Sequence, residues 1–238
     1  ATGQGKTKTI YNILNEVHNN FGINFLILEA AKKEYRGLNT MPENNLNRIK
    51  VITPGSETLW PLRINLFEPM GYGTAQYDQP LIKHIYLLEK VFRAALPMPS
   101  ILPMILLKSL KSVYSDKGWK ILEVNDKSED ITIPTIHDLL QTMDKQIQSS
   151  TYSEETKDHI RAMFDTRFSR LSEDLMGQIL FGETTSPSWD YLFNNPVLIE
   201  LDGLHDDNIN LIAIFIIMML YEYRKLMQHQ DKDKDLNH

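Results

Sequence analysis

The chain has 238 residues, of which 42% are hydrophobic and 24% are charged, and its formal net charge is −6. A chain of this length can bury one sizeable core, and its composition excludes the disordered, collagen-like and membrane-spanning classes. Cysteine is absent, so disulfide scaffolds and thiolate zinc sites are excluded as well.

The chain opens on the glycine-rich segment Ala1-Thr2-Gly3-Gln4-Gly5-Lys6-Thr7. This segment matches the phosphate-binding loop GxxxxGK[ST] at every position but the first, which requires a glycine directly before Ala1. Because the chain also begins with alanine rather than methionine, we expect a fragment from which a preceding strand is missing. The alternative is a chance glycine-rich turn in front of a helix.

Each residue type in this segment has a chemical reason to be there. Gly3 and Gly5 allow the tight backbone curve whose N–H groups point at phosphate oxygens. Lys6 is expected to reach the β- and γ-phosphates of ATP, and Thr7 to supply its hydroxyl to Mg²⁺. The predicted cofactor-binding residues are Thr2, Gly3, Gln4, Gly5, Lys6, Thr7 and Lys8, with Thr7 as the metal ligand.

The segments after this loop come in the order that a phosphate-binding loop requires. Apolar residues recur at i, i+3, i+4 and i+7 from Ile10 to Val17, which predicts a helix from near Lys6 to just before Gly22. Residues 25–28 then form a short apolar run, typical of a buried parallel strand, that ends in Glu29. The sequence therefore predicts loop, helix and strand in succession.

The rest of the chain alternates between short strands and a long helical stretch. We expect strands at residues 49–53, 64–67 and 197–201. We expect helices near 76–95, 101–116, 135–148 and 154–176, a final helix from about residue 206, and a solvated loop at 231–235.

These elements predict an α/β fold: a RecA-like P-loop core with a mostly parallel sheet and an inserted helical subdomain. The expected domains are a first part of the core at 1–75, the helical insertion at 76–185, and a return to the core at 186–238. The last part contains one strand and one long helix.

ATP hydrolysis needs acidic residues near the phosphates, to orient water and to hold the magnesium shell. The candidates are Glu29 at the end of the first strand, Glu34 five residues later, and Glu200 with Asp202 at the end of the last strand. For each of them the alternative is a solvated or helix-capping carboxylate.

Basic residues supply a second set of candidates. Lys32, Lys33 and Arg36 cluster just past the first strand, where they contact either phosphate, a neighbouring subunit or only solvent. Arginines 161, 167 and 170 lie on one predicted helix and favour surface salt bridges over the role of an arginine finger. The seven histidines show no spacing that suggests a metal site.

The sequence resembles the HerA-type ATPases, which are relatives of the FtsK DNA translocases and of the ATPases that power conjugative transfer. The resemblance is carried by residues 1–9, 25–36, 64–69 and 197–204. The first segment is common to all P-loop proteins, whereas the strand followed by Lys-Lys-Glu-Tyr-Arg and the strand Glu-Leu-Asp-Gly-Leu are more particular to bacterial HerA-like proteins.

The resemblance implies a homo-hexameric ring that hydrolyses ATP and moves along double-stranded DNA beside a nuclease or another effector protein, in DNA end processing or anti-phage defence. The acid-ending Walker B strand of the family follows the long helix after Glu-Leu-Asp-Gly-Leu, and this chain stops at His238 before such a strand. The resemblance therefore lowers the rank of Glu200 and Asp202, and leaves Lys6, Glu34 and Glu29 as the predicted catalytic residues.

Two other functional hypotheses remain open at this stage. One is a nucleotide-dependent assembly platform, a ring that recruits and activates an effector while ATP turnover is incidental. The other is a P-loop kinase, against which the lack of a recognisable acceptor site or lid counts weakly. Neither a targeting signal nor a membrane-spanning run is present, so we expect a cytoplasmic protein with no membrane partner.

Overall fold

The computed structural model describes residues 5–40, 49–54, 61–74, 77–98, 101–126 and 131–236. The chain forms two compact units, one of residues Ala1–Arg63 and Ser186–Leu204, the other of residues Ile64–Thr185 and His205–His238. The expected insertion of a helical domain at residues 76–185 between the two parts of the core, 1–75 and 186–238, stays a prediction.

The first unit is built around a small parallel sheet. Its elements are α1 (Lys6–Phe21), β1 (Leu26–Glu29), the 3₁₀ helix η1 (Tyr35–Thr40), β2 (Lys50–Ile52), α7 (Trp189–Asn194) and β3 (Val197–Glu200). Within the described residues the strand order is β1-β3-β2, and both outer strands run parallel to β3. The α/β class and the parallel sheet are confirmed, whereas the larger RecA-like sheet stays a prediction.

The central strand is the most deeply buried part of this sheet. All four residues of β3 are buried, which is the pattern of a strand covered on both faces. Leu198 forms a core cluster with Leu38 of η1 and with Ile49, and Tyr11 and Leu14 of α1 pack against that cluster. The helix was predicted from apolar spacing, but Ile10 and Ile13 of that spacing are exposed, and the face of α1 that contacts the cluster is that of Tyr11 and Leu14.

Helix α1 ends where the sequence predicts. Gly22 adopts a left-handed conformation with φ 63°, and its N–H donates to the carbonyl of His18. Glycine takes this conformation without the steric cost that a Cβ adds, which makes it the common residue just past a helix.

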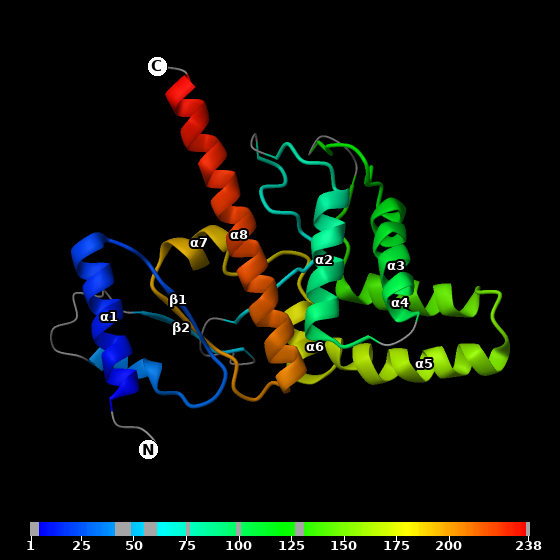
Figure 1. Cartoon of the computed structure of the whole chain (residues 1–238), viewed down its shortest axis with the longest axis horizontal. Coiled ribbons are helices and arrows are strands. Elements are labelled where there is room, and N and C mark those ends of the chain that lie inside the picture. The colour runs from blue at the N-terminus through cyan, green and yellow to red at the C-terminus, as the bar shows by residue number, and fades with distance from the viewer. Residues whose placement is uncertain are drawn as a thin grey trace. The chain divides into compact units, whose positions relative to one another are not determined.

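The second unit is helical. Its elements are α2 (Ile82–Ala95), α3 (Leu102–Asp116), α4 (Ile136–Gln148), α5 (Glu154–Phe168), the 3₁₀ helix η2 (Ser169–Leu171), α6 (Asp174–Leu180) and α8 (Asp206–Leu236). Helix α2 packs against α3 and α8, and α4 packs against α3 and α5 (Figure 1). The expected loop at residues 231–235 is wrong, because α8 continues through it.

The strand expected at residues 64–67 is also wrong, and Asn65 explains why. This residue is 1% exposed; its side-chain amide donates to the carbonyls of Pro134 and Glu183, and its Oδ1 accepts the N–H of Phe67. An asparagine side chain that takes the N–H two residues ahead turns the backbone away from a strand. The only bridge described nearby joins Arg63 to Ser186.

The helix expected over residues 154–176 is divided in two. α5 ends at Phe168, and α6 starts only at Asp174, which has φ 48°. Between them Ser169 Oγ donates to the carbonyl of Asp165, and Ser172 Oγ donates to the carbonyl of Ser169. Serine hydroxyls that bond nearby backbone carbonyls compete with continued helix.

No helix among the described residues is long and apolar enough to cross a membrane.

Candidate functional site

Polar side chains gather where the three parallel strands end. Glu29 ends β1, Thr53 follows β2, and Glu200 ends β3. Parallel strands direct their carboxyl ends to the same edge of a sheet, and open α/β sheets bind ligands at that edge. The acids and the basic cluster singled out in the sequence therefore belong to one region of the first unit.

One glycine of the predicted phosphate-binding loop, Gly5, lies directly before α1 in the described part of the chain. Gly5 precedes the helix with φ 117° and ψ −32°, a conformation that favours glycine over residues with a Cβ. The carbonyl of Gly5 accepts the N–H of Thr9 at 2.8 Å. The partial positive charge at the start of a 16-residue helix favours an anion there.

The other predicted loop residues differ in how much can be said of them. Thr2, Gly3 and Gln4 lie outside the described residues. Lys6 and Lys8 are exposed, and Lys6 forms no ion pair with any residue in the described part of the chain. Its ammonium is therefore accessible to a ligand.

Thr7 and Glu34 lie in direct contact. The Thr7 hydroxyl donates to Glu34 Oε2 at 2.8 Å, although the two residues are 27 positions apart. Tyr11, one helical turn past Thr7, donates its hydroxyl to the backbone carbonyl of Glu34. Burial, together with Glu29 and Glu34, raises the pKa of Tyr11, so this donor keeps its proton.

Glu29 fixes the loop that carries Glu34. Glu29 is only 6% exposed. Its Oε1 accepts hydrogen bonds from the backbone N–H of Glu34 at 2.8 Å and from that of Tyr35 at 3.4 Å. Oε2 is buried and has no hydrogen-bond partner among the described residues. The loop also holds Lys32 at φ 85°, an uncommon conformation for a residue other than glycine.

Arg36 and Glu200 form a second interaction at the same edge. Arg36 Nε and a terminal guanidinium nitrogen contact the two Glu200 oxygens at 2.5 and 2.7 Å, and Thr53 Oγ1 donates to Glu200 Oε2 at 2.8 Å. Glu200 is 1% exposed. The Arg36 hydrogen bond lowers the pKa of Glu200 and raises that of Arg36, so the pair stays ionised.

This geometry separates the four acidic candidates. Glu34 contacts Thr7, and Glu29 holds the backbone of Glu34, so these two are joined to the start of α1. Glu200 is held by Arg36 and Thr53, and Asp202 pairs with Lys33 at 3.4 Å. Two of the three basic cluster residues are thus engaged by acids of the β3 end.

The sequence did not single out Thr53 or Tyr11. A threonine after a short strand carries no spacing signal, and its role arises only because β2 and β3 are neighbours in the sheet. Tyr11 lies within the predicted helix but outside its apolar spacing, and its hydroxyl contact depends on the loop after β1 folding back over α1. The described residues hold no cluster of histidine, aspartate or glutamate suited to a metal ion on its own.

Arg161, one of the arginines on the predicted helix at 154–176, makes surface ion pairs. It lies 3.6 Å from Asp144 and 3.7 Å from Asp158, and its side chain is 38% exposed. Such exposed pairs are common on helix surfaces, which agrees with the salt-bridge interpretation of this residue.

The fold and the site together define an α/β protein with a small parallel sheet, a glycine-led helix start at the sheet edge and a separate helical unit. The solved structure of VirB4 from Thermoanaerobacter pseudethanolicus has a similar fold, with a TM-score of 0.60 and 16% sequence identity. The alignment covers 92% of this chain and 75% of the VirB4 chain. No protein-family model and no curated protein sequence matches the chain.

Proposed function

We propose that this chain is the nucleotide-binding part of an ATP-hydrolysing P-loop motor. The observation that carries the proposal is the contact between Thr7, at the start of α1, and Glu34, in the loop after β1. Magnesium–nucleotide chemistry uses a hydroxyl in the first turn of such a helix together with a nearby carboxylate. The likeness of the fold to VirB4 adds support.

The roles of the residues follow from their chemistry. The backbone N–H groups of the first turn of α1, with Gly5 before them, bind phosphate oxygens, and the exposed Lys6 ammonium neutralises their charge. Because the Thr7 hydroxyl donates a hydrogen bond to Glu34, the lone pairs of its oxygen remain available to coordinate Mg²⁺. Bound Mg²⁺ supplies charge neutralisation at the reacting phosphate.

Glu34 and Glu29 have distinct parts in this proposal. Glu34 stands beside the predicted metal ligand and orients either Thr7 or a water molecule of the magnesium shell. Glu29 acts on the backbone of Glu34 and is a positioning residue, since its Oε1 is committed to two N–H groups. The Walker B glutamate and the arginine finger have no position assigned in this chain.

We further propose that the motor is a homo-hexameric ring in the cytoplasm that translocates or unwinds double-stranded DNA with a nuclease or other effector protein. The bacterial HerA-like segments in the sequence support this part of the proposal, and anti-phage defence or DNA end processing is the setting they indicate. VirB4 supports the broader class of P-loop motor through its fold.

The test is ATP hydrolysis by the full-length protein with and without duplex DNA, together with its mass in solution. We expect hydrolysis that DNA stimulates, a ring-sized particle, and loss of nucleotide binding in Lys6→Ala. Lys90→Ala, an exposed lysine on α2, is the matched control and should keep full activity.

Two outcomes separate the hypotheses. Equal hydrolysis with and without DNA, in a protein that never forms a ring, would exclude the motor. A Lys6→Ala protein that still assembles and still activates an effector would favour the assembly platform instead.

A further inference from the structure

Glu34 is held through its backbone as well as through its side chain. Its N–H donates to Glu29 Oε1 at 2.8 Å, and its carbonyl accepts the N–H of Gly37 at 3.0 Å and the hydroxyl of Tyr11. Glu29 ends β1 and Gly37 belongs to η1, whereas Tyr11 belongs to α1, the helix that carries Thr7. Tyr11 therefore ties the backbone of this loop to the helix of the predicted metal ligand.

Thr7 and Tyr11 are spaced to act on the same residue. They lie four positions apart, so their side chains project from one face of α1, with roughly 6 Å between them along the helix axis. The Thr7 hydroxyl donates to the side chain of Glu34 at 2.8 Å, and the Tyr11 hydroxyl donates to the backbone carbonyl of Glu34. Because both hydrogen bonds begin on one helix, they hold Glu34 at two points and fix where its carboxylate lies relative to Thr7.

The Tyr11 ring is packed on more than one side. It lies against the core cluster that contains Leu198, and its centroid is 5.6 Å from that of the Tyr35 ring. Gly37 leaves room for the hydroxyl, because a Cβ at that position would lie 3.0 Å from the Tyr11 oxygen and 3.4 Å from a ring carbon. This packing restricts the ring, so the hydroxyl loses little further freedom when it bonds the Glu34 carbonyl.

A phenol suits this contact because it has a proton to donate. Burial, followed by the nearby carboxylates of Glu29 and Glu34, raises the pKa of Tyr11 above its ordinary value of 10.0, so the hydroxyl stays protonated at neutral pH. A phenylalanine at this position keeps the ring and loses only the hydrogen bond. The packing of Tyr11 and its hydrogen bond can therefore be tested separately.

We propose that Tyr11 is a positioning residue of the predicted ATP site, which holds Glu34 against Thr7 by way of the Glu34 carbonyl. The inference rests on the proposed function. Tyr11 acts through Glu34, whose carboxylate orients Thr7 or a water molecule of the magnesium shell. The effect on the rate follows from geometry, because a misplacement of about 1 Å can cost a reaction about 100-fold.

The first test follows the ¹³C-methyl signal of Thr7 in the full-length protein without nucleotide. This methyl group is attached to the same carbon as the hydroxyl that donates to Glu34, so its chemical shift reports whether that bond is made. Glu34→Ala, which removes the acceptor, gives the reference shift. We expect Tyr11→Phe to move the signal in the same direction, and Tyr221→Phe, on an exposed tyrosine of α8, to leave it in place. An unmoved Thr7 signal in Tyr11→Phe would overturn the inference.

The second test compares single-turnover ATP hydrolysis with equilibrium ATP binding. We expect Tyr11→Phe to lower the hydrolysis rate about fivefold, as the loss of one hydrogen bond implies, while ATP binds as tightly as before. In a Glu34→Ala protein the same change should have no further effect, because Tyr11 acts only through Glu34. A purely structural role would instead weaken ATP binding and add to the loss in Glu34→Ala, and either result overturns the inference.

Gly37→Ala disturbs the same contact without changing Tyr11 itself. The added Cβ presses on the Tyr11 hydroxyl, so we expect a shift of the Thr7 signal and a fall in rate similar to those of Tyr11→Phe. When the hydroxyl is already absent, Gly37→Ala should add little. Equal effects of Gly37→Ala with and without that hydroxyl would contradict the inference.

Failure of the proposed function gives a different result. If the unaltered protein does not bind ATP, the proposed function falls and the inference falls with it. If the unaltered protein binds and hydrolyses ATP and Tyr11→Phe does so equally well, the inference alone is wrong.

Discussion

Thr7 and Glu34 are the residues on which the nucleotide hypothesis rests most directly. Glu34→Gln keeps the size of the side chain and removes its charge. If Glu34 orients water or the magnesium shell, we expect ATP hydrolysis to fall roughly 100-fold while nucleotide binding changes little, as measured by single-turnover hydrolysis and by equilibrium binding.

The control for this variant is Glu16→Gln, on the exposed side of α1. It makes the same chemical change away from the sheet edge and should leave hydrolysis at the level of the unaltered protein. An equal loss in both variants would assign the effect to net charge rather than to the position of Glu34.

His84 predicts how stability depends on pH. The ordinary histidine pKa is 6.5, and burial lowers that of His84 to about 4, so below pH 6.5 the unfolded chain takes up a proton that the folded protein excludes until about pH 4. The neutral, buried His84 therefore makes its full contribution to the free energy of unfolding above pH 6.5. Between pH 6.5 and pH 4 the free energy of unfolding falls by roughly 3 kcal/mol.

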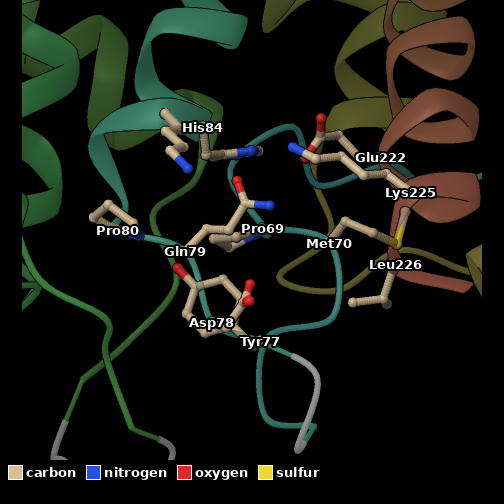
Figure 2. Close-up of a pocket in the computed structure, with 11 residues that line it drawn as sticks. Pro69, Met70, Tyr77, Asp78, Gln79, Pro80, His84, Glu222, Lys225 and Leu226 are labelled. Carbon is tan, nitrogen blue, oxygen red and sulfur yellow. The ribbon is translucent and has the colours of Figure 1, made fainter. Parts of the chain in front are cut away.

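Urea unfolding across this pH range measures the effect. Comparison with His84→Phe isolates it, because the acidic and basic groups around the small cavity beside His84 are the same in both proteins. Figure 2 shows this cavity, whose charged lining residues are Asp78, Lys83, Glu222 and Lys225. His159→Gln, at an exposed position of α5, should follow the pH dependence of the unaltered protein. A His84→Phe curve that fell as steeply would contradict the buried neutral histidine.

At the scale of elements, the Arg36–Glu200 pair ties η1 to the end of β3. Arg36→Ala leaves the buried Glu200 carboxylate with Thr53 as its remaining described partner, which we expect to lower the free energy of unfolding by roughly 2 kcal/mol. Lys33→Ala, which breaks the partly exposed pair with Asp202, should cost less than about 1 kcal/mol. Chemical unfolding of both variants checks the order, and equal losses would contradict it.

Helix α6 carries a glycine whose replacement has two opposed effects. Alanine favours helix over glycine by about 1 kcal/mol, but a Cβ at Gly177 would lie 2.5 Å from the carbonyl oxygen of Ser172. Because that oxygen belongs to the backbone of the turn before α6, it cannot move aside cheaply. We expect Gly177→Ala to lower stability by roughly 2 kcal/mol net.

Thermal unfolding followed by circular dichroism is the measurement for this variant. Gln178→Ala, at the next and exposed position of α6, carries the helix preference without the contact and should leave the midpoint nearly unchanged. A Gly177→Ala protein more stable than the original would mean that helix preference outweighs the close approach.

At the scale of the whole molecule, the net charge of −6 bears on the proposed DNA partner. An acidic chain has few phosphate contacts to offer from a single subunit, so duplex binding should require assembly, in which several subunits face the same DNA. We expect fluorescence anisotropy to detect duplex binding only under conditions that give the ring. Binding by the isolated subunit, as strong as that of the ring, would contradict this.

Local signals determined much of this protein from the sequence alone. The apolar spacing from Ile10 to Val17 and the glycine at position 22 gave α1 its limits, and the apolar runs before Glu29 and Glu200 gave two strands of the sheet. These features depend on residues only a few positions apart, so the spacing of residue types along the sequence is enough to predict them.

Only the tertiary structure decided the features that join distant residues. The pairing of β1 with β3 brings Glu29 and Glu200, which are 171 positions apart, to one edge of the sheet. The contact of Thr7 with Glu34 singles out one acid among four. Asn65 turned an expected strand into an irregular segment by bonding carbonyls far along the chain. Such contacts carry no periodicity, because they form only after the elements have packed.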